Sequence, residues 1–321
     1  MKMKVMMIGF SGSGKTTYMG ALYSALNQAW YNGFSLRARR ESDHNNFMRI
    51  GENLDKGIYP KGTDILQDYN FSLLYNGSEV LDFDWHDYRG GALQQPDSED
   101  FNCVISSIIN SDALIIFLDM PMFYPGRERL AIRILKQVSS LVQNVTSKLP
   151  EDAIFPISFV STKFDCIFSD DTAQSVFETS GWKQLEQLKL LVAKSKNLHG
   201  LWTATVVAKD QYVDIQYPFL FSMKYALMKK FNEMVQEHND LVRKCDEYAA
   251  KGGFLDDVFT GLGNWFNGTN YATYNELAAR AASSAQKIRS IAEDIIDGPL
   301  KKIDKQLEED VMNNDILLQI F

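Results

Sequence analysis

Three scarcities narrow what this sequence can encode. Its 321 residues include only three cysteines, Cys103, Cys166 and Cys245, which are odd in number and far apart. Neither a disulfide framework nor a zinc site with the usual ligand spacing is therefore expected. The four histidines are too scattered to supply a metal centre. Positive charge is not in excess, because the net charge is −8, which argues against a nucleic-acid partner.

Long apolar runs are also missing. No stretch approaches the roughly 18 uninterrupted apolar residues of a membrane-spanning helix. The apolar run at residues 5–8 is too short for a signal peptide, so a cytoplasmic protein with at most peripheral membrane contact is expected. With 45% hydrophobic and 12% aromatic residues, the chain can bury a substantial core.

A complete phosphate-binding motif is present near the start of the chain. Residues 9–16 read Gly-Phe-Ser-Gly-Ser-Gly-Lys-Thr, which matches G-x-x-x-x-G-K-[ST], after the apolar run and before an amphipathic pattern. The glycines let the backbone turn so that its N–H groups surround phosphates at the start of a helix. Lys15 is expected to reach the β- and γ-phosphates and Thr16 to bind Mg²⁺. These features predict a nucleotide-binding protein.

Two further motifs follow later apolar runs. Residues 87–90 read Asp-Tyr-Arg-Gly, in which Asp87 can hold Mg²⁺ through water and the N–H of Gly90 can contact a γ-phosphate. Residues 162–165 read Thr-Lys-Phe-Asp and match [NT]-K-x-D. The carboxylate of Asp165 can accept hydrogen bonds from both N1–H and the exocyclic amine of guanine, which adenine does not offer, while the stem of Lys163 covers the base. The motif at residues 162–165 therefore predicts selection of GTP over ATP.

In order and spacing, these motifs resemble those of P-loop GTPases of the Ras-like and translation-factor-related (TRAFAC) class, over about residues 3–235. Because 47 residues separate Lys15 from Thr63, the chain resembles the bacterial double-GTPase type more than Ras. The resemblance implies that Thr63, 24 positions before Asp87, closes over Mg²⁺ and the γ-phosphate. It also implies that the backbone N–H of Ala208, in the Val-Ala-Lys after the last strand, contacts the guanine oxygen.

The position that orients the attacking water departs from this resemblance. Gly91 stands where Ras-like proteins carry a glutamine, so intrinsic hydrolysis is expected to be slow. Gln94, Gln95 and His86 are candidates for orienting that water. Arg89 is a candidate for an arginine that stabilises transition-state charge from within the chain. The alternative interpretation is an ordinary loop or strand side chain for the first three and a partner contact for Arg89.

The fold class follows from the alternation of apolar runs with helical patterns in the first two-thirds of the chain, which predicts an α/β fold with a mostly parallel sheet. Tyr-Asn-Gly-Ser at residues 75–78 is a hairpin signal and adds one antiparallel strand. Together with the motifs, this predicts the three-layer α/β/α sandwich of P-loop NTPases. The nucleotide-binding domain is expected over residues 1–217, with a helical insertion about 31–62. Residues 218–321 are expected to form an α-helical extension, ending in one short helix or a frayed segment after residue 300.

One stretch of this extension, residues 254–266, places large apolar side chains at helical spacing between acidic residues and glycines. Docking on the rest of the chain is favoured over insertion at a membrane surface or binding of a partner. The reason is that interfacial helices usually carry lysine or arginine on their polar face.

The expected function is a GTPase switch that binds GTP or GDP with Mg²⁺ and engages a protein partner or activator through its switch loops and helical tail. Two alternatives remain open: a scaffold that holds guanine nucleotide with negligible hydrolysis, and a P-loop protein that uses ATP. The catalytic candidates are Lys15, Thr63, Arg89, Gly90 and Gln94; the nucleotide-binding candidates are Gly9, Ser11, Gly12, Ser13, Gly14, Lys15, Thr16, Thr17, Thr162, Lys163, Asp165 and Ala208; and the metal candidates are Thr16, Thr63 and Asp87.

Overall fold

The computed structural model describes residues 2–29, 33–61, 67–87, 99–167, 170–209, 211–250, 278–286, 289, 300–313 and 318–321. Contacts divide the chain into two compact units. The first consists of Met1–Ala226 and Lys302–Phe321, and the second of Leu227–Lys301. The phosphate-binding and [NT]-K-x-D motifs both belong to the first unit. The domain boundary expected after residue 217 stays a prediction.

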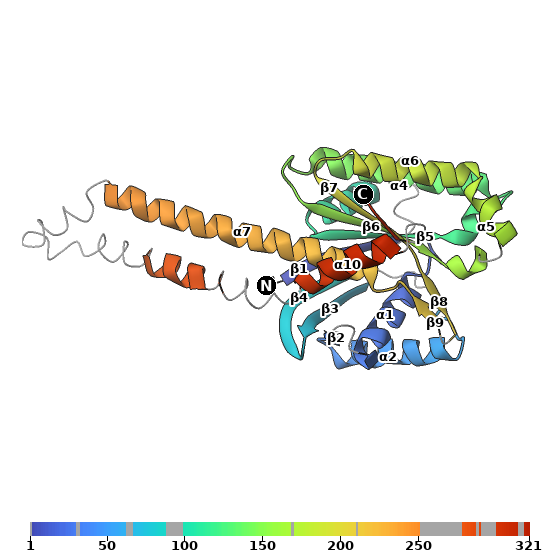
Figure 1. Cartoon of the computed structure of the whole chain (residues 1–321), viewed down its shortest axis with the longest axis horizontal. Coiled ribbons are helices and arrows are strands. Elements are labelled where there is room, and N and C mark those ends of the chain that lie inside the picture. Colours follow the sequence, from blue (N-terminus) through green and yellow to red (C-terminus); the bar gives the residue numbers. More distant parts are fainter. Residues whose placement is uncertain are drawn as a thin grey trace, which may run out of the picture. The chain divides into compact units, whose positions relative to one another are not determined.

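An eight-stranded sheet forms the centre of the first unit (Figure 1). Its strand order is β10-β7-β6-β5-β1-β4-β3-β2. The central strands from β7 to β4 are parallel, β3 runs antiparallel to β4 and to β2, and β10 runs antiparallel to β7. The strands are β1 (Lys2–Gly9), β2 (Phe34–Ala38), β3 (Gln67–Tyr75), β4 (Ser78–Asp87), β5 (Ala113–Asp119), β6 (Phe155–Thr162), β7 (Leu198–Ala204) and β10 (Leu318–Ile320), and a separate hairpin consists of β8 (Val206–Ala208) and β9 (Gln211–Val213).

Helices cover both faces of this sheet. On β1, alternate side chains point to opposite faces, so Met6 and Ile8 join the core under α3, α4 and α6. On the other face, Trp85 of β4 contacts both Tyr18 of α1 and Phe219 at the start of α7. The helices are α1 (Lys15–Ala29), α2 (Glu41–Asp55), α3 (Glu99–Ile109), α4 (Glu128–Lys148), α5 (Asp170–Phe177), α6 (Ser180–Ala193), α7 (Tyr217–Ala250) and α10 (Lys301–Asn313), with 3-10 turns η2 (Met120–Phe123) and η3 (Phe164–Ile167).

This architecture confirms the predicted three-layer α/β/α sandwich, including the antiparallel strand β3 joined to β4 through the turn at Asn76 and Gly77. The inserted helix is α2, and the helix expected after residue 300 is α10. The sheet also has two edge strands that the sequence does not predict, β2 and β10. β10 has only three residues, too few for alternation to indicate a strand, whereas β2 does alternate over five residues but lies in the segment that was predicted as a helical insertion.

The last strand, β10, docks through a close backbone contact. Phe321 and Gly200 exchange backbone hydrogen bonds of 2.9 and 2.6 Å. A Cβ at Gly200 would lie 2.3 Å from the Phe321 ring, so glycine is required for this approach. The Phe321 ring stacks near Phe159 of β6. The end of the chain therefore becomes part of the sheet that carries the nucleotide motifs.

The second unit includes most of α7, and its residues 278–286 are also helical. Within α7, Arg243 forms ion pairs with Asp240 and Glu247, one turn away in each direction. The apolar stretch 254–266 lies outside the described residues, and its interpretation stays a prediction.

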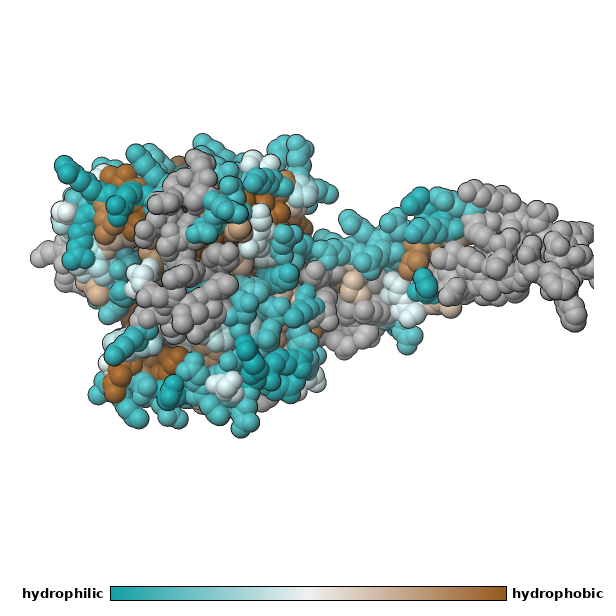
Figure 2. Space-filling model, turned by 180° about the vertical axis from the view of Figure 1, so that it is seen from behind, coloured by the Kyte–Doolittle hydropathy of each residue, from teal (hydrophilic) through white to brown (hydrophobic). Residues whose placement is uncertain are grey.

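On the face that Figure 2 shows, the coloured surface is mainly hydrophilic. In Figure 2, polar residues occupy most of the coloured surface and hydrophobic residues form separate areas. Among the described residues, no helix combines the length and the apolar character needed to cross a bilayer.

Candidate functional site

The phosphate-binding loop connects the end of β1 to the first residue of α1. Gly12 and Gly14 have φ angles of 80° and 87°, a region that side chains other than glycine rarely adopt. A Cβ at Gly9 would lie 2.5 Å from the Ser13 hydroxyl oxygen. The glycines thus shape a loop whose backbone leads into the N-terminus of a helix, where N–H groups and the helix dipole favour an anion.

A buried ion pair lies beside this loop. The Lys15 ammonium donates to the Gly9 carbonyl oxygen at 2.9 Å and lies 3.7 Å from Asp87 Oδ1. Their side chains are only 11% and 7% exposed. Burial lowers the pKa of Lys15, and Asp87 opposes this shift; burial also raises the pKa of Asp87 to about 6, and Lys15 opposes that shift. Both side chains are almost excluded from water. A bound polyanion would therefore stabilise the charge of Lys15, and a cation bound to that polyanion would stabilise the charge of Asp87.

The residues present fit a nucleotide-bound Mg²⁺. Asp87 Oδ1 is buried and accepts no hydrogen bond from a described group, so it has capacity for a metal-bound water. Thr16, in the first turn of α1, lines the cavity of the phosphate-binding loop, and so does Lys15, the ion-pair partner of Asp87. Among the described residues, no three histidine, cysteine or acidic side chains converge as metal ligands. Mg²⁺ commonly takes one or two protein ligands and obtains the others from phosphates and water, which suits this sparse set.

The [NT]-K-x-D motif is bonded directly to the phosphate-binding loop. Thr162 Oγ1 donates to the Ser13 carbonyl oxygen at 2.9 Å. The Lys163 ammonium donates to the Gly12 carbonyl oxygen at 2.9 Å and pairs with Asp119 Oδ1 at 2.9 Å. Lys163 has a φ of 57°, a strained value for a lysine that these contacts hold in place. Two motifs far apart in sequence therefore form one framework.

Two adjoining cavities are lined by residues of these two motifs. One, of about 240 Å³, is lined by the phosphate-binding loop from Ser11 to Thr17. The other, of about 250 Å³, is lined by Asp165, Cys166 and the segment after β7. Together they fall within the roughly 300–1,000 Å³ typical of small-molecule sites. The residues that line both are Gly14, Thr17, Tyr59 and Lys163.

Most nucleotide-binding residues expected from the sequence meet here. The loop residues Ser11 to Thr17, together with Thr162, Lys163 and Asp165, line one or both cavities, and Gly9 lies directly behind the loop. Ala208 lies in β8, and the residues of that segment that line the Asp165 cavity are Thr205 and Val207. Cys166 also lines this cavity.

Some residues of the site were missed in the sequence. Asp119 ends the buried strand β5, and that position alone was a signal, because ligands bind at the carboxyl ends of parallel strands. Tyr59 lines both cavities, yet it follows α2 in a segment without a motif. Thr205 and Val207 had only their place after the last parallel strand to mark them.

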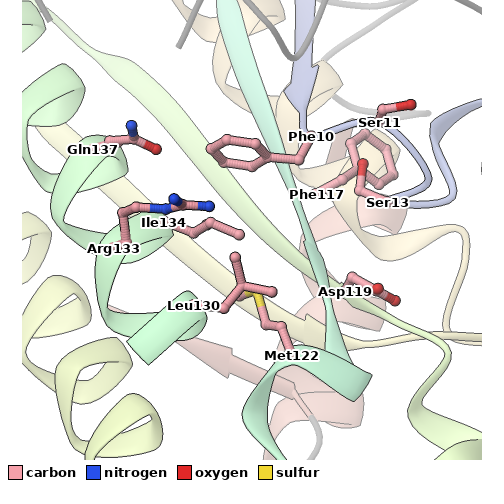
Figure 3. Close-up of a pocket in the computed structure, with 10 residues that line it drawn as sticks. All are labelled: Phe10, Ser11, Ser13, Phe117, Asp119, Met122, Leu130, Arg133, Ile134 and Gln137. Carbon is pink, nitrogen blue, oxygen red and sulfur yellow. The ribbon is translucent and has the colours of Figure 1, made fainter. Parts of the chain in front are cut away.

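A third cavity, of about 410 Å³, opens on the other side of the loop (Figure 3). It shares Ser11 and Ser13 with the loop, and Arg133 and Gln137 reach it from α4. Asp165 and Lys15 are not among its lining residues. The groups suited to a base and to phosphates therefore line the two smaller cavities.

The remaining catalytic and switch candidates cannot be placed in this geometry. Thr63, Arg89, Gly90 and Gln94 lie outside the described residues, as do Gln95 and Gly91. His86 is described, and its Nδ1 lies 2.6 Å from Asp68 Oδ1 on the neighbouring strand. Their catalytic roles stay predictions.

No protein-family model matches this sequence, and no curated protein matches it. Solved structures with a similar arrangement include the following three. The Arl6 BBS3 small GTPase from Trypanosoma brucei is 16% identical, with 70% of this chain and 98% of that chain covered and a TM-score of 0.37. The signal recognition particle receptor SRb-GTP/SRX complex from Chaetomium thermophilum is 14% identical, with 65% and 92% covered and a TM-score of 0.38.

The third is an ADP ribosylation factor-like GTP-binding protein, the small COPII coat GTPase SAR1, from Encephalitozoon cuniculi in complex with GDP. It is 10% identical, with 73% of this chain and 83% of that chain covered and a TM-score of 0.32. At this level of similarity, function has to be argued from the site itself.

Proposed function

We propose that this protein binds GTP and GDP with Mg²⁺, hydrolyses GTP slowly, and acts as a nucleotide-dependent switch. One observation carries the proposal: the cavity of the phosphate-binding loop and the cavity lined by Asp165 share lining residues, among them Lys163, which is bonded to the loop. A ligand that fills both spaces needs a polyanion at one end and a hydrogen-bonding base at the other.

Base selection follows from the chemistry of Asp165. Its carboxylate accepts the N1–H and the exocyclic amine of guanine, whereas adenine presents an unprotonated N1 at the corresponding place. The stem of Lys163 covers one side of the base. We assign the contact with the guanine oxygen to the backbone N–H of Ala208, which follows Val207 at the edge of this cavity.

Phosphate binding depends on the loop N–H groups and on Lys15. Thr16, which lines the phosphate cavity, would hold Mg²⁺, and Asp87, paired with Lys15 of the loop, would hold it through water. When bound, the ion would supply positive charge that neutralises the phosphates during transfer. Lys15 holds the β- and γ-phosphates in line for attack by water.

The switch itself is assigned to the segments that carry Thr63 and Gly90. Thr63 joins the Mg²⁺ sphere and Gly90 senses the γ-phosphate, so both segments are released after hydrolysis. Arg89 and Gln94 remain the candidates for transition-state stabilisation and water positioning. The helical tail transmits the state to a protein partner. The free cysteines support a reducing, cytoplasmic setting.

The decisive experiment identifies the nucleotide released when the purified protein is denatured and then measures GTP turnover with Mg²⁺. Wild type, Lys15→Ala and the exposed control Lys194→Ala are compared. Guanine nucleotide together with turnover that is lost in Lys15→Ala alone supports the proposal. Adenine nucleotide would overturn the assignment of Asp165 and favour the ATP-using alternative.

A second function is favoured by Gly91, which occupies the place of the water-orienting glutamine. In that alternative the protein is a scaffold that retains guanine nucleotide with negligible hydrolysis. It predicts bound guanine nucleotide after purification and no turnover, with or without a cell extract as a source of activator.

A further inference from the structure

Tyr59 lies where the base cavity and the phosphate cavity meet. The residue lines both cavities and is 52% exposed. Its hydroxyl donates to the Val207 carbonyl oxygen at 3.3 Å, across 148 positions of sequence. The contact joins the segment after α2 to the β8–β9 hairpin, which follows the last parallel strand. Tyr59 and Val207 thus close one side of the nucleotide site.

A second link joins the same hairpin to α2. The Tyr212 hydroxyl on β9 donates to Asp55 Oδ1 at 2.7 Å and lies 3.4 Å from the Gly51 carbonyl oxygen. Nearby, Gly57 has a φ of 74°, and a Cβ there would lie 3.8 Å from the Lys209 Cβ. The end of α2 and the hairpin therefore contact each other just before the chain reaches Tyr59.

The α2 side of this arrangement is held in place because α2 packs closely on α1. A Cβ at Gly20 would lie 2.2 Å from Ile50 Cγ2, and a Cβ at Gly51 would lie 2.4 Å from the Ser24 side chain. Two glycines thus let a side chain of each helix lie against the backbone of the other, where sliding meets steric resistance. Since α1 begins at Lys15, this packing fixes the position of α2 relative to the phosphate-binding loop.

We propose that α2 and the β8–β9 hairpin form a clamp that holds Tyr59 over the bound nucleotide and sets the rate at which nucleotide leaves. Tyr212 and Asp55 are positioning residues: they touch no nucleotide, and they lock the hairpin to α2. Release requires Tyr59 to swing away from Val207, and the Tyr212–Asp55 bond opposes that movement. The inference rests on the proposed function, because it presupposes a nucleotide in these cavities.

The test measures release of a fluorescent GDP analogue from the full-length protein after addition of excess unlabelled GDP with Mg²⁺. Tyr212→Phe removes one hydroxyl and keeps the ring. Loss of a hydrogen bond to a carboxylate predicts release that is about five- to tenfold faster. Asp55→Asn keeps an acceptor oxygen and is expected to have a smaller effect. Guanine preference over adenine should not change in either variant.

Tyr217→Phe is the matched control. The Tyr217 hydroxyl donates to Asp310 Oδ2, also at 2.7 Å, but this pair joins α7 to α10 and involves neither α2 nor the β8–β9 hairpin. Thermal unfolding should show comparable small losses in both tyrosine variants, whereas release should accelerate only in Tyr212→Phe. Release at the wild-type rate from a Tyr212→Phe protein that binds GDP overturns the clamp and leaves the proposed function intact. Failure of wild type itself to bind guanine nucleotide overturns both.

Discussion

The ammonium group of Lys163 lies 2.9 Å from the carbonyl oxygen of Gly12, although 151 positions separate the two residues. Lys163 belongs to the motif assigned to the base and Gly12 to the loop assigned to the phosphates. The same ammonium pairs with Asp119 at the end of β5. One side chain therefore fixes the spacing between the two halves of the site, and the order of both halves should depend on it.

Replacing Lys163 by alanine should weaken guanine-nucleotide binding by about tenfold. The variant loses a charged hydrogen bond to the loop and an ion pair with Asp119. Because the Lys163 side chain is about half exposed, these interactions are expected to contribute energies at the lower end of the usual range. Fluorescence titration with a GDP analogue measures the effect. Lys196→Ala, an exposed lysine after α6, is the control and should bind like wild type. Equal affinities for both variants would contradict the bridging role.

Replacing Asp165 by asparagine should reduce the preference for guanine over adenine nucleotides by at least about tenfold. The amide can no longer accept both guanine donors, and one donor stays unpaired. Competition titrations with GDP and ADP measure the preference. Asp152→Asn, in the exposed turn after α4, is the control for loss of one negative charge. An unchanged preference in Asp165→Asn would favour the ATP-using alternative.

The stability of the first unit should depend on pH through Asp214. Burial, followed by repulsion from Asp310, raises the pKa of this carboxyl to about 6. The folded protein then binds the proton more tightly than the unfolded chain, where the pKa is roughly 3.9. The contribution of Asp214 to the free energy of unfolding is therefore most favourable below about pH 4 and is lost as pH rises through about 6.

Asp214→Asn tests this dependence. Asn tolerates the φ of 58° at this position and removes the charge. At pH 7 the variant should gain about 1 kcal/mol in the free energy of unfolding, after allowance for solvent screening of a partly exposed group. Urea unfolding at pH 7 and pH 4.5 should show that the gain shrinks at the lower pH. A gain of the same size at both values would contradict the titration of Asp214.

Gly200→Ala should loosen the last strand of the sheet. The new methyl group would meet the Phe321 ring at 2.3 Å, and overpacking of this kind typically costs about 1–3 kcal/mol. Hydrogen exchange at the amide of Phe321, which bonds to Gly200, should accelerate. Combining Gly200→Ala with Phe321→Ala removes the clash, so the two losses should not add. Additive losses would mean that the methyl group and the ring do not meet.

The predictable part of this molecule is its local part. The central strands and α2 follow from alternation and helical periodicity, and the hairpin at Asn76 and Gly77 from its turn residues. The phosphate-binding loop was predictable from its glycines, because at two of these positions the backbone has a positive φ angle that other residues rarely adopt. Asp165 was recognisable because its motif requires four consecutive residues and the end of a strand. In each case the signal and the structure lie within the same short segment.

The amino-acid sequence by itself determined the α/β sandwich, the loop at residues 9–16 and the candidate groups for base and phosphates. Only the tertiary structure decided that Tyr59 meets Val207 and that Tyr212 bonds to Asp55, across 148 and 157 positions. It also decided that the last strand completes the sheet beside β7. The physical reason is that these contacts join loops and sheet edges that are far apart in sequence and meet only when the chain folds around its core. A residue that makes such a contact produces no hydrophobic periodicity in its own segment, so the sequence does not reveal it.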